Sequence, residues 1–286
     1  MKRDAPHGSS AIAMELMGIC RRSISVWVAV ILLCVAAGAG RASQYQDTLP
    51  DGQINTGSAS VFTVLTSSSD WTRGGSVLGG DVGIDQGQFS LWGGSEVLGD
   101  LVYHTGVVIT TSGGSVHGTT YSDDPLIDSA LMDAQMLSDA ASAESVTPRY
   151  TTLTSVNLNH SSLTITGSAN EKVVLRLTDF VLTNNSILTL SGTATTSFIV
   201  NVTETFSLRS NSHISLVNVP ASNVLFNIRG TGSTVWLRGG STLPGTLLAL
   251  NRKVRIKGGS QVVGTVIANQ VKITKHSSVL TPTRNL

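Results

Sequence analysis

The chain has 286 residues, and only 13% of them are charged and 5% aromatic. Its 41% of hydrophobic residues can bury a core, which excludes a chain that is disordered throughout. The formal net charge of +1 excludes a uniformly polycationic or polyanionic protein. Gly, Ser, Thr and Val are abundant, and because these residues are poor helix formers the composition predicts an all-β fold.

Residues 1–42 are typical of a secretory signal peptide. Arg21 and Arg22 precede the apolar stretch "SISVWVAVILLCVAAGAG", and small residues lead up to a cleavage point before Ser43. The apolar run of roughly 14 residues is shorter than the ~20 that span a bilayer, although a signal anchor is the alternative. We therefore predict a secreted or cell-surface protein with no transmembrane anchor in its mature chain.

The mature chain is predicted to comprise an N-terminal linker, residues 43–58, and a single domain, residues 59–286. Both cysteines, Cys20 and Cys34, fall within the leader. An exported domain without disulfides has to gain its stability from core burial or from a repetitive backbone ladder. We expect no cofactor and no metal bound through cysteine.

A Gly-Gly-Ser phrase, with another glycine three or four residues later, occurs five times. Neighbouring copies within its two groups are 19 or 20 residues apart, a period typical of solenoids whose coils bury their apolar faces only by stacking. Glycine suits a corner where φ is positive. The phrase therefore predicts a β-solenoid corner rather than a nucleophile elbow, which needs Gly-x-Ser-x-Gly. Its serines are Ser76, Ser95, Ser115, Ser241 and Ser260.

The first coils contain four acidic residues that need weighing as a site, namely Asp81, Asp85, Glu96 and Asp100. Paired carboxylates can act as acid and base or hold Ca²⁺, but here we predict solvated turn residues. The five histidines of the mature chain show neither metal-ligand spacing nor a Ser-His-Asp pattern. We therefore predict that the protein is not an enzyme and holds no metal. These histidines are His104, His117, His160, His213 and His276.

One helix is predicted at about residues 125–142. Asp124 is a suitable N-cap, and Pro125 suits the first helical position. One apolar stripe lies opposite Asp128, Asp133 and Asp139, so the helix should pack along the solenoid. The stripe consists of Ile127, Ala130, Leu131, Ala134, Leu137 and Ala141.

Residues 150–227 continue as strands without the Gly-Gly-Ser phrase. Threonines two residues apart place both hydroxyls on one face of a strand, which makes them candidates for a polar binding face. Three sequons begin at Asn159, Asn184 and Asn201 and matter only in a eukaryotic host. The threonines are Thr152, Thr154, Thr164, Thr166, Thr193 and Thr195, with a further pair at Thr203 and Thr205.

The last coils can be aligned on their serines, and the alignment assigns faces. Trp236, Arg255 and Lys272 should point outward, and the residues that alternate with them should point inward. The predicted inward residues are Val235, Leu237, Val254, Ile256, Val271 and Ile273, followed on the next side by Leu247, Ala249, Val266 and Ala268.

Positive charge is concentrated in the same coils. Residues 43–204 contain 16 acidic and four basic side chains, whereas residues 205–286 contain ten basic and no acidic ones. One predicted column, in which each cation precedes a serine by three residues, consists of Arg209, Arg238, Lys257 and Lys275. Stacked at ~4.8 Å, such cations repel one another unless they fan into solvent or meet an anion, and both interpretations stay open.

Several segments together resemble a known group of proteins: "VLGGDVGI", "TSFIVNV", "SNVLFNI" and "PGTLLAL" with "GGSQVVGTVIA". They are similar to the microbial ice-binding-like β-solenoids and to the related secreted choice-of-anchor A domains, over roughly residues 59–280. The resemblance implies a discontinuous β-solenoid of triangular cross-section with a long helix alongside. It also implies that the protein binds either ice or, as an adhesive module, another surface.

Two functions follow, and they involve different residues. The first is surface attachment or an extracellular structural role, through an anionic polysaccharide bound by basic coils around Trp236. The alternative is ice binding by the threonine face. Self-association of the acidic and basic halves is a further possibility, and no nucleic-acid partner is expected. The basic residues are Arg209, Arg229, Arg238, Arg252, Lys253, Arg255, Lys257, Lys272 and Lys275.

Overall fold

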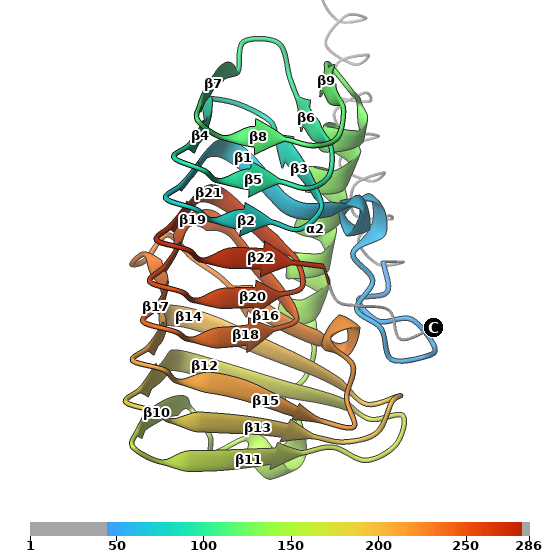
Figure 1. Ribbon diagram of the computed structural model, residues 1–286. Coiled ribbons are helices and arrows are strands. Elements are labelled where there is room, and N and C mark those ends of the chain that lie inside the picture. Colours follow the sequence, from blue (N-terminus) through green and yellow to red (C-terminus); the bar gives the residue numbers. More distant parts are fainter. Residues whose placement is uncertain (1–44, 282–286) are drawn as a thin grey trace, which may run out of the picture. The chain divides into compact units, whose positions relative to one another are not determined.

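Parallel β-strands stacked coil upon coil account for most of the structure (Figure 1). The computed structural model describes residues 45–281, so the signal peptide predicted for residues 1–42 lies outside the described residues. The strands form one sheet of 13 strands and one of nine, and every pairing between named strands is parallel within the described part. The predicted all-β solenoid is therefore confirmed.

The nine-stranded sheet runs in the order β11 (Ser162–Thr166), β13 (Ile187–Ser191), β15 (His213–Val217), β18 (Thr242–Pro244), β20 (Gln261–Val263), β22 (Ser278–Leu280), β2 (Val77–Leu78), β5 (Glu96–Val97) and β8 (Ser115–Val116). The main path of the larger sheet is β10 (Ser155–Asn159), β12 (Lys172–Thr183), β14 (Ser197–Arg209), β16 (Val224–Ile228), β19 (Thr246–Lys257), β21 (Val266–Thr274), β1 (Phe62–Arg73), β3 (Asp81–Ile84), β6 (Leu101–Tyr103) and β9 (Thr120–Ser122). Beside it lie β17 (Val235–Arg238), β4 (Gln88–Trp92) and β7 (Val108–Ser112).

The larger sheet supplies two sides of a three-sided coil. Its long strands change partner along their length, since the first half of β1 pairs with β3 and the second half with β4. A register shift marks the bend in each long strand, between Thr66 and Ser69 in β1 and between Ala249 and Lys253 in β19. We call the first halves the helix side, because helix α2 (Leu126–Ala143) covers them, and the second halves the cationic side. The nine-stranded sheet is the third side.

The coils do not stack in chain order. β21, from the last coil, pairs with β1, from the first, so that Ile267 lies beside Leu65 and Lys272 beside Trp71. Strand β1 therefore lies within the stack, between β21 and β3, and not at its end (Figure 1). Strand β1 belongs to the acidic part of the chain and β21 to the basic part. Their pairing therefore brings the two parts together within one molecule.

The corner serines have a structural role. In the coil of Ser260, Gly258 and Gly259 have φ angles of 70° and 73°, a conformation that glycine adopts without steric cost. The Ser260 hydroxyl donates to the Lys257 carbonyl at 3.0 Å and accepts the Ser241 N–H of the next coil at 3.1 Å. The corners at Ser186, Ser212 and Ser277 have the same backbone conformation without glycine: the two residues before each of these serines also have positive φ. The predicted strand region 150–227 therefore uses the same device.

The predicted inward faces are confirmed. All ten aligned Val, Leu, Ile and Ala side chains of the last coils are fully buried, whereas Trp236, Arg255 and Lys272 are only partly buried and point outward. Lower in the stack the same interior position holds aromatic rings, with Phe180 and Phe206 stacked at 4.8 Å between centroids.

Helix α2 begins at Leu126, one residue later than predicted, and the Asp124 carboxylate accepts the Leu126 N–H at 2.9 Å. The predicted stripe is buried except for Leu131, which is half-buried, while Ser138 joins the buried face. No helix in residues 45–281 has the length and apolarity needed to cross a membrane.

Buried amides hold the helix on its sheet. Asn227 accepts the Ser138 hydroxyl at 2.8 Å and donates to the Ser138 carbonyl at 3.0 Å. Asn227 also donates to Asn201, whose own amide donates to the Ala141 carbonyl at 2.8 Å. These bonds satisfy polar groups that are buried between two layers. They also occupy the sequon asparagine Asn201, whose side chain is buried and inaccessible to glycosylation.

The stretch predicted as a linker, residues 43–58, is packed onto the solenoid from Gln46 onward. Thr48 bridges Ile54, and the helical turn η1 (Gly57–Val61) contacts α2. The Lys172 ammonium lies 2.6 Å from Asp47 and 2.7 Å from Glu144. One cation therefore joins the N-terminal segment, the end of the helix and β12.

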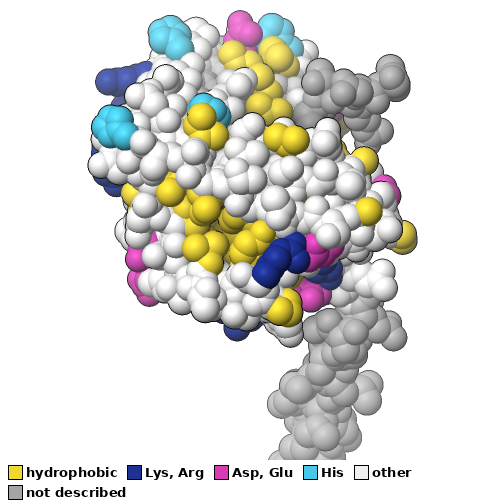
Figure 2. All heavy atoms as spheres, turned by 90° about the horizontal axis from the view of Figure 1, so that it is seen from below, with side chains coloured by type: hydrophobic (Ala, Val, Ile, Leu, Met, Phe, Trp, Pro, Cys, Tyr) yellow, Lys and Arg dark blue, Asp and Glu magenta, His cyan; other side chains and the backbone are white. Residues whose placement is uncertain are grey.

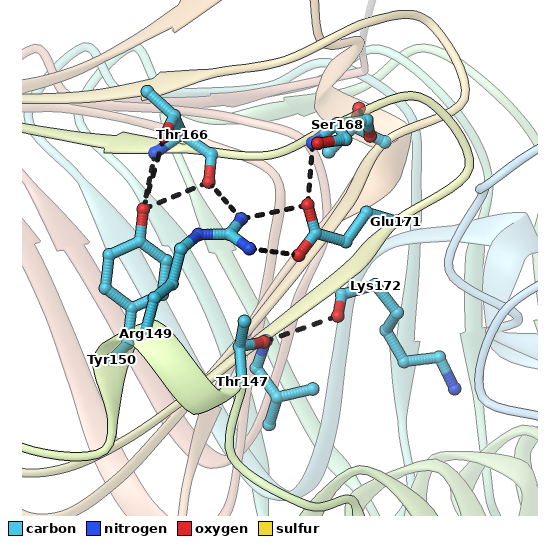
Figure 3. A network of polar contacts seen from close by, with 9 residues as sticks. Thr147, Arg149, Tyr150, Thr166, Ser168, Glu171 and Lys172 are labelled. Carbon is cyan, nitrogen blue, oxygen red and sulfur yellow. Dashed lines mark hydrogen bonds and ion pairs between the residues drawn. The ribbon is translucent and has the colours of Figure 1, made fainter.

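A polar network protects the open edge of β11 (Figure 3). Arg149 and Tyr150 lie in the turn η2 (Pro148–Tyr150), and the guanidinium of Arg149 contacts both oxygens of Glu171 at 2.5 and 2.9 Å. Tyr150 pairs with both the N–H and the carbonyl of Thr166, which an additional coil would otherwise bind. The hydrogen bond from Arg149 lowers the pKa of Glu171. Figure 2 looks onto this end, where partly buried apolar side chains gather.

Candidate functional site

The outer face of the nine-stranded side is regular and nearly free of charge. Among its nine strands Glu96 is the only Asp, Glu, Lys or Arg residue. No pairing in this sheet shows a register shift within the described residues, in contrast to the larger sheet. Nine strands at the usual spacing extend for about 38 Å. The face is therefore a long array of polar and aliphatic groups, in which β15 and β18 are joined through the single pair His213 and Thr242.

The structure brings only part of the predicted threonine face together. Thr164 and Thr166 lie exposed on β11, but Thr152 and Thr154 precede β10 in a turn. Thr193 and Thr195 form a corner after β13, where their hydroxyls contact each other at 3.2 Å. The prediction of one shared face is wrong for these four, because a Thr-x-Thr pattern does not distinguish a strand from a turn.

The hydroxyl rows that do exist on the nine-stranded side combine the predicted Thr164 and Thr166 with residues that the sequence did not single out. Thr164 pairs with Thr189 and Thr189 with Ser215, while Thr166 pairs with Ser191. A second polar row runs through Thr242, Gln261 and Ser278. These residues are one per coil, so no short motif in the sequence marks them.

The predicted cationic column exists with one correction. Arg209 pairs with Arg238, and Arg238 with Lys257, but Lys257 pairs with Thr274 instead of Lys275. The corner serine of that coil is Ser277, whose hydroxyl donates to the Thr274 carbonyl at 2.9 Å. Lys275 instead takes a corner position with φ of 61°. It still lines a depression of about 280 Å³ together with Arg238 and Lys257.

Tryptophans flank the cations on the cationic side. One outward row runs Trp236, Arg255, Lys272 and Trp71, and the next ends in Arg73 and Trp92. The cations of Arg238, Arg255 and Lys257 lie 5.0–5.7 Å from the ring centroid of Trp236. Lys253 lies 5.9 Å from that of Trp71. These are cation–π distances, so the two indole rings stabilise some of the closely spaced cations.

The remaining repulsion on the cationic side is not compensated. Burial and the adjacent Arg238 lower the pKa of Arg209. Burial, together with the charges of Arg73, Arg255 and Lys253, lowers the pKa of Lys272. From β14 to β4 the outward rows of this side hold no Asp or Glu among the described residues. An anion bound there would relieve the repulsion.

Two of the predicted basic residues serve the fold instead. Arg252 is 2% exposed, and its guanidinium donates to the carbonyls of Thr203, Glu204 and Arg229. Arg229 lies 3.7 Å from Asp139 of the helix. Arg252 holds a loop in place and Arg229 pairs with α2, so neither residue belongs to the cationic side.

The acidic residues of the first coils bind backbone groups and a histidine. Asp81 accepts the Asp100 N–H at 2.8 Å, and Asp100 in turn accepts the Thr119 N–H at 2.6 Å, which ties three coils together at one corner. His104 lies 2.9 Å from Asp85 and 4.0 Å from Asp128 of the helix.

Asp85, His104 and Asp128 each offer a ligand atom, and these atoms lie within 4.8 Å of one another. Metal ligation would use one imidazole nitrogen and two carboxylate oxygens. The same groups already link the coil to the first turn of α2, through the hydrogen bond between His104 and Asp85 and the approach of His104 to Asp128, and this role accounts for their positions.

Comparison with solved structures places the fold among ice-binding proteins. An ice-binding protein from the Antarctic ascomycete Antarctomyces psychrotrophicus matches with a TM-score of 0.52 and 20% identity, over 79% of this chain and 96% of that one. The ice-binding protein LeIBP from an Arctic yeast matches with a TM-score of 0.55 and 18% identity, over 83% and 98%. An ice-binding protein from an Antarctic biological consortium matches with a TM-score of 0.52 and 17% identity, over 83% of this chain and 93% of that one. No curated protein matches the sequence.

A family model described as "Putative Ice-binding-like adhesive domain" matches residues 48–279. The match starts within the packed N-terminal segment and ends in the last strand, β22, so it covers the solenoid and its helix. The chain belongs to this ice-binding-like adhesive domain family.

Proposed function

We propose that the protein is an exported, non-enzymatic surface-binding module that adsorbs to ice through its nine-stranded side. The observation that carries the proposal is a face of nine parallel strands without a register shift among the described pairings and with a single charged residue in its strands. Membership of an ice-binding-like family and structural neighbours named as ice-binding proteins support it over the polysaccharide function expected first from the sequence.

The other two sides suit ice less well. Helix α2 covers one of them, and its contacts with the sheet are apolar and amide-mediated. The cationic side carries stacked ammonium and guanidinium groups, which hold their own ordered water and hinder adsorption to a lattice of neutral water. The nine-stranded side repeats small hydroxyl and aliphatic groups at the constant inter-strand distance, so many weak contacts can form together.

We expect Thr189→Lys to abolish inhibition of ice recrystallisation without unfolding the protein. Thr189 lies between Thr164 and Ser215 in the hydroxyl row. A long charged side chain at this position would keep the ice surface from contacting the neighbouring hydroxyls. Ice grain size after annealing measures the effect. Thr110→Lys is the matched control, because Thr110 is a half-buried strand residue of the larger sheet. Equal activity of the two variants would place the ice-binding face elsewhere.

A second candidate function is attachment to an anionic polysaccharide through the cationic side. The uncompensated rows of cations and tryptophans favour it. Such a surface can act alongside the nine-stranded side, because the two are different sides of the same coil. Adhesion to a charged extracellular polymer and adsorption to ice therefore compete for no residue.

Binding to a polyuronate should depend strongly on salt. Screening at ~0.5 M salt shortens the Debye length to about 4 Å, so most of the affinity seen at low salt should be lost. Arg238→Ala should weaken binding several-fold, whereas Arg229→Ala, which removes the same charge beside the helix, should change it little. Retention on a polyuronate column across a salt gradient measures both. Equal retention of the two variants would show that net charge alone drives binding.

A further inference from the structure

A depression on the cationic side lies at the junction of the first and last coils. Trp71, Arg73 and Lys272 line it from β1 and β21, and Gln88, Ser90 and Trp92 line it from β4. Its volume is about 260 Å³, at the lower end for ligand pockets and suited to a single ring. Because β21 pairs with β1 only through the out-of-order stacking, the pocket exists only in the assembled solenoid.

The two indoles form the apolar walls of the pocket. Trp71 pairs with Ser90 and lies beside Lys272, and Trp92 pairs with Arg73 in the next row. Trp92 is 44% exposed, which is unusual for so large an apolar side chain in a fold with few aromatics. An exposed indole next to a second one provides surfaces on which the C–H face of a ring can pack.

Ser90 supplies an independent observation. Its side chain is 95% buried, yet its hydroxyl has no hydrogen-bond partner among residues 45–281. A buried hydroxyl without a partner costs free energy, and native structures rarely leave one unexplained. Ser90 is among the residues that line the pocket, and a turn of its side chain toward the pocket would let its hydroxyl pair with a hydroxyl of a bound ring. Gln88 offers an amide at the same wall.

Arg73 and Lys272 give the pocket its charge preference. Burial, and after it the charges of Arg73, Arg255 and Lys253, lower the pKa of Lys272, so these cations repel one another. The residues lining the pocket include no acid. A single carboxylate or sulfate between Arg73 and Lys272 would therefore be held by both cations and would also lower their mutual repulsion.

We propose that this pocket binds one acidic sugar unit, a uronate or sulfated pyranose, of an extracellular polysaccharide. The faces of the saturated ring pack on Trp71 and Trp92, its hydroxyls pair with Ser90 and Gln88, and its acidic group faces Arg73 and Lys272. The proposal rests on the second candidate function and assigns it a defined subsite. The rest of the cationic side then contacts neighbouring units along the polymer.

The test is calorimetric titration of the purified protein with a short oligouronate prepared from alginate, with a neutral dextran oligomer as the control ligand. We expect Trp92→Ala to weaken oligouronate binding by about tenfold. Tyr121→Ala is the matched control, because Tyr121 is an aromatic residue of similar exposure, 46%, on β9 and outside the cationic side; it should weaken binding less than about twofold.

Ser90→Val separates binding from stability. Removing a hydroxyl that has no partner leaves Tm unchanged or raised, so weaker binding at an equal or higher Tm supports the pocket. Equal losses in Trp92→Ala and Tyr121→Ala would overturn the assigned pocket. So would wild-type affinity in both Trp92→Ala and Ser90→Val, and if Arg238→Ala were weakened at the same time, polysaccharide attachment would stand without this subsite.

The remaining outcomes concern the ligand class. Absence of oligouronate binding by the wild-type protein would reject both the subsite and the polysaccharide function. Tighter binding of a single-stranded oligonucleotide than of the oligouronate would overturn the sugar assignment, because bases also stack on indoles beside cations.

Discussion

Ile256→Asp is expected to leave the protein unfolded at room temperature. Ile256 is fully buried between Leu237 and Ile273 of the adjacent coils. A carboxylate at this position would have no cation to pair with in the interior formed by the described residues. An unpaired buried charge costs several kcal/mol, and the lost aliphatic packing adds about 2–4 kcal/mol. Native domains are stable by only about 5–15 kcal/mol.

Arg255→Asp is the matched control for this variant. It introduces the same side chain one residue earlier, but on the outward face beside Trp236 and Lys272. We expect it to keep a cooperative urea transition, while Ile256→Asp lacks one and elutes as an expanded or aggregated chain. A soluble Ile256→Asp protein with a native-like transition would contradict the register of the last three coils.

Asp70 should make the stability of the protein fall as the pH rises from about 4 to about 7. It takes the interior position that Val271 and Phe89 occupy in the adjacent coils. The Thr72 hydroxyl donates to one carboxyl oxygen at 2.8 Å, and the other has no partner within the described chain. Burial raises the pKa of Asp70 from 3.8 to about 7, against the opposing effect of the Thr72 hydrogen bond.

The direction of this change in stability with pH follows from proton binding. Between pH 3.8 and about 7 the folded protein keeps the Asp70 proton and the unfolded chain releases it, so unfolding becomes more favourable as the pH rises. Above about pH 7 both states are ionised and the loss is complete. A shift of about three pKa units corresponds to on the order of 4 kcal/mol.

Asp70→Asn removes this ionisation and should therefore be more stable than the wild type at about pH 8, but not at about pH 4. Urea unfolding of both proteins at several pH values measures this difference in the free energy of unfolding. The difference between the two curves cancels Glu171 and Asp123, whose lowered pKa values act in the opposite direction in both proteins. A difference that does not change with pH would show that Asp70 is ionised in the native core at low pH.

The sequence predicts a solenoid when its corners recur. Aligning the serines at Ser241 and Ser260 assigns every inward residue of those coils correctly, because the residues on one face of a strand alternate without exception there. The same alignment fails by one residue at Lys275, where a Lys-His pair replaces Gly-Gly at the two positions of positive φ. A corner defined by backbone conformation can be built from several residue types, and only the glycine version is visible in the sequence.

The candidate surfaces were harder to predict because they depend on coil order. Trp71, Arg73 and Trp92 lie in the acidic part of the chain and join the basic coils only when β21 pairs with β1. Thr189 and Ser215 likewise form a row only through their pairing. Arg252 shows the reverse error, since its charge suggested a surface role although its guanidinium binds backbone carbonyls in the interior.

The most direct test of ice adsorption by the nine-stranded side is an ice-shaping and recrystallisation assay on the purified wild-type protein at low and moderate salt. Faceted crystals and arrested grain growth are expected at both salt concentrations, because the face has a single charged residue. Round crystals that grow at the rate seen in buffer would contradict the proposed function and leave polysaccharide attachment by the cationic side as the function to pursue.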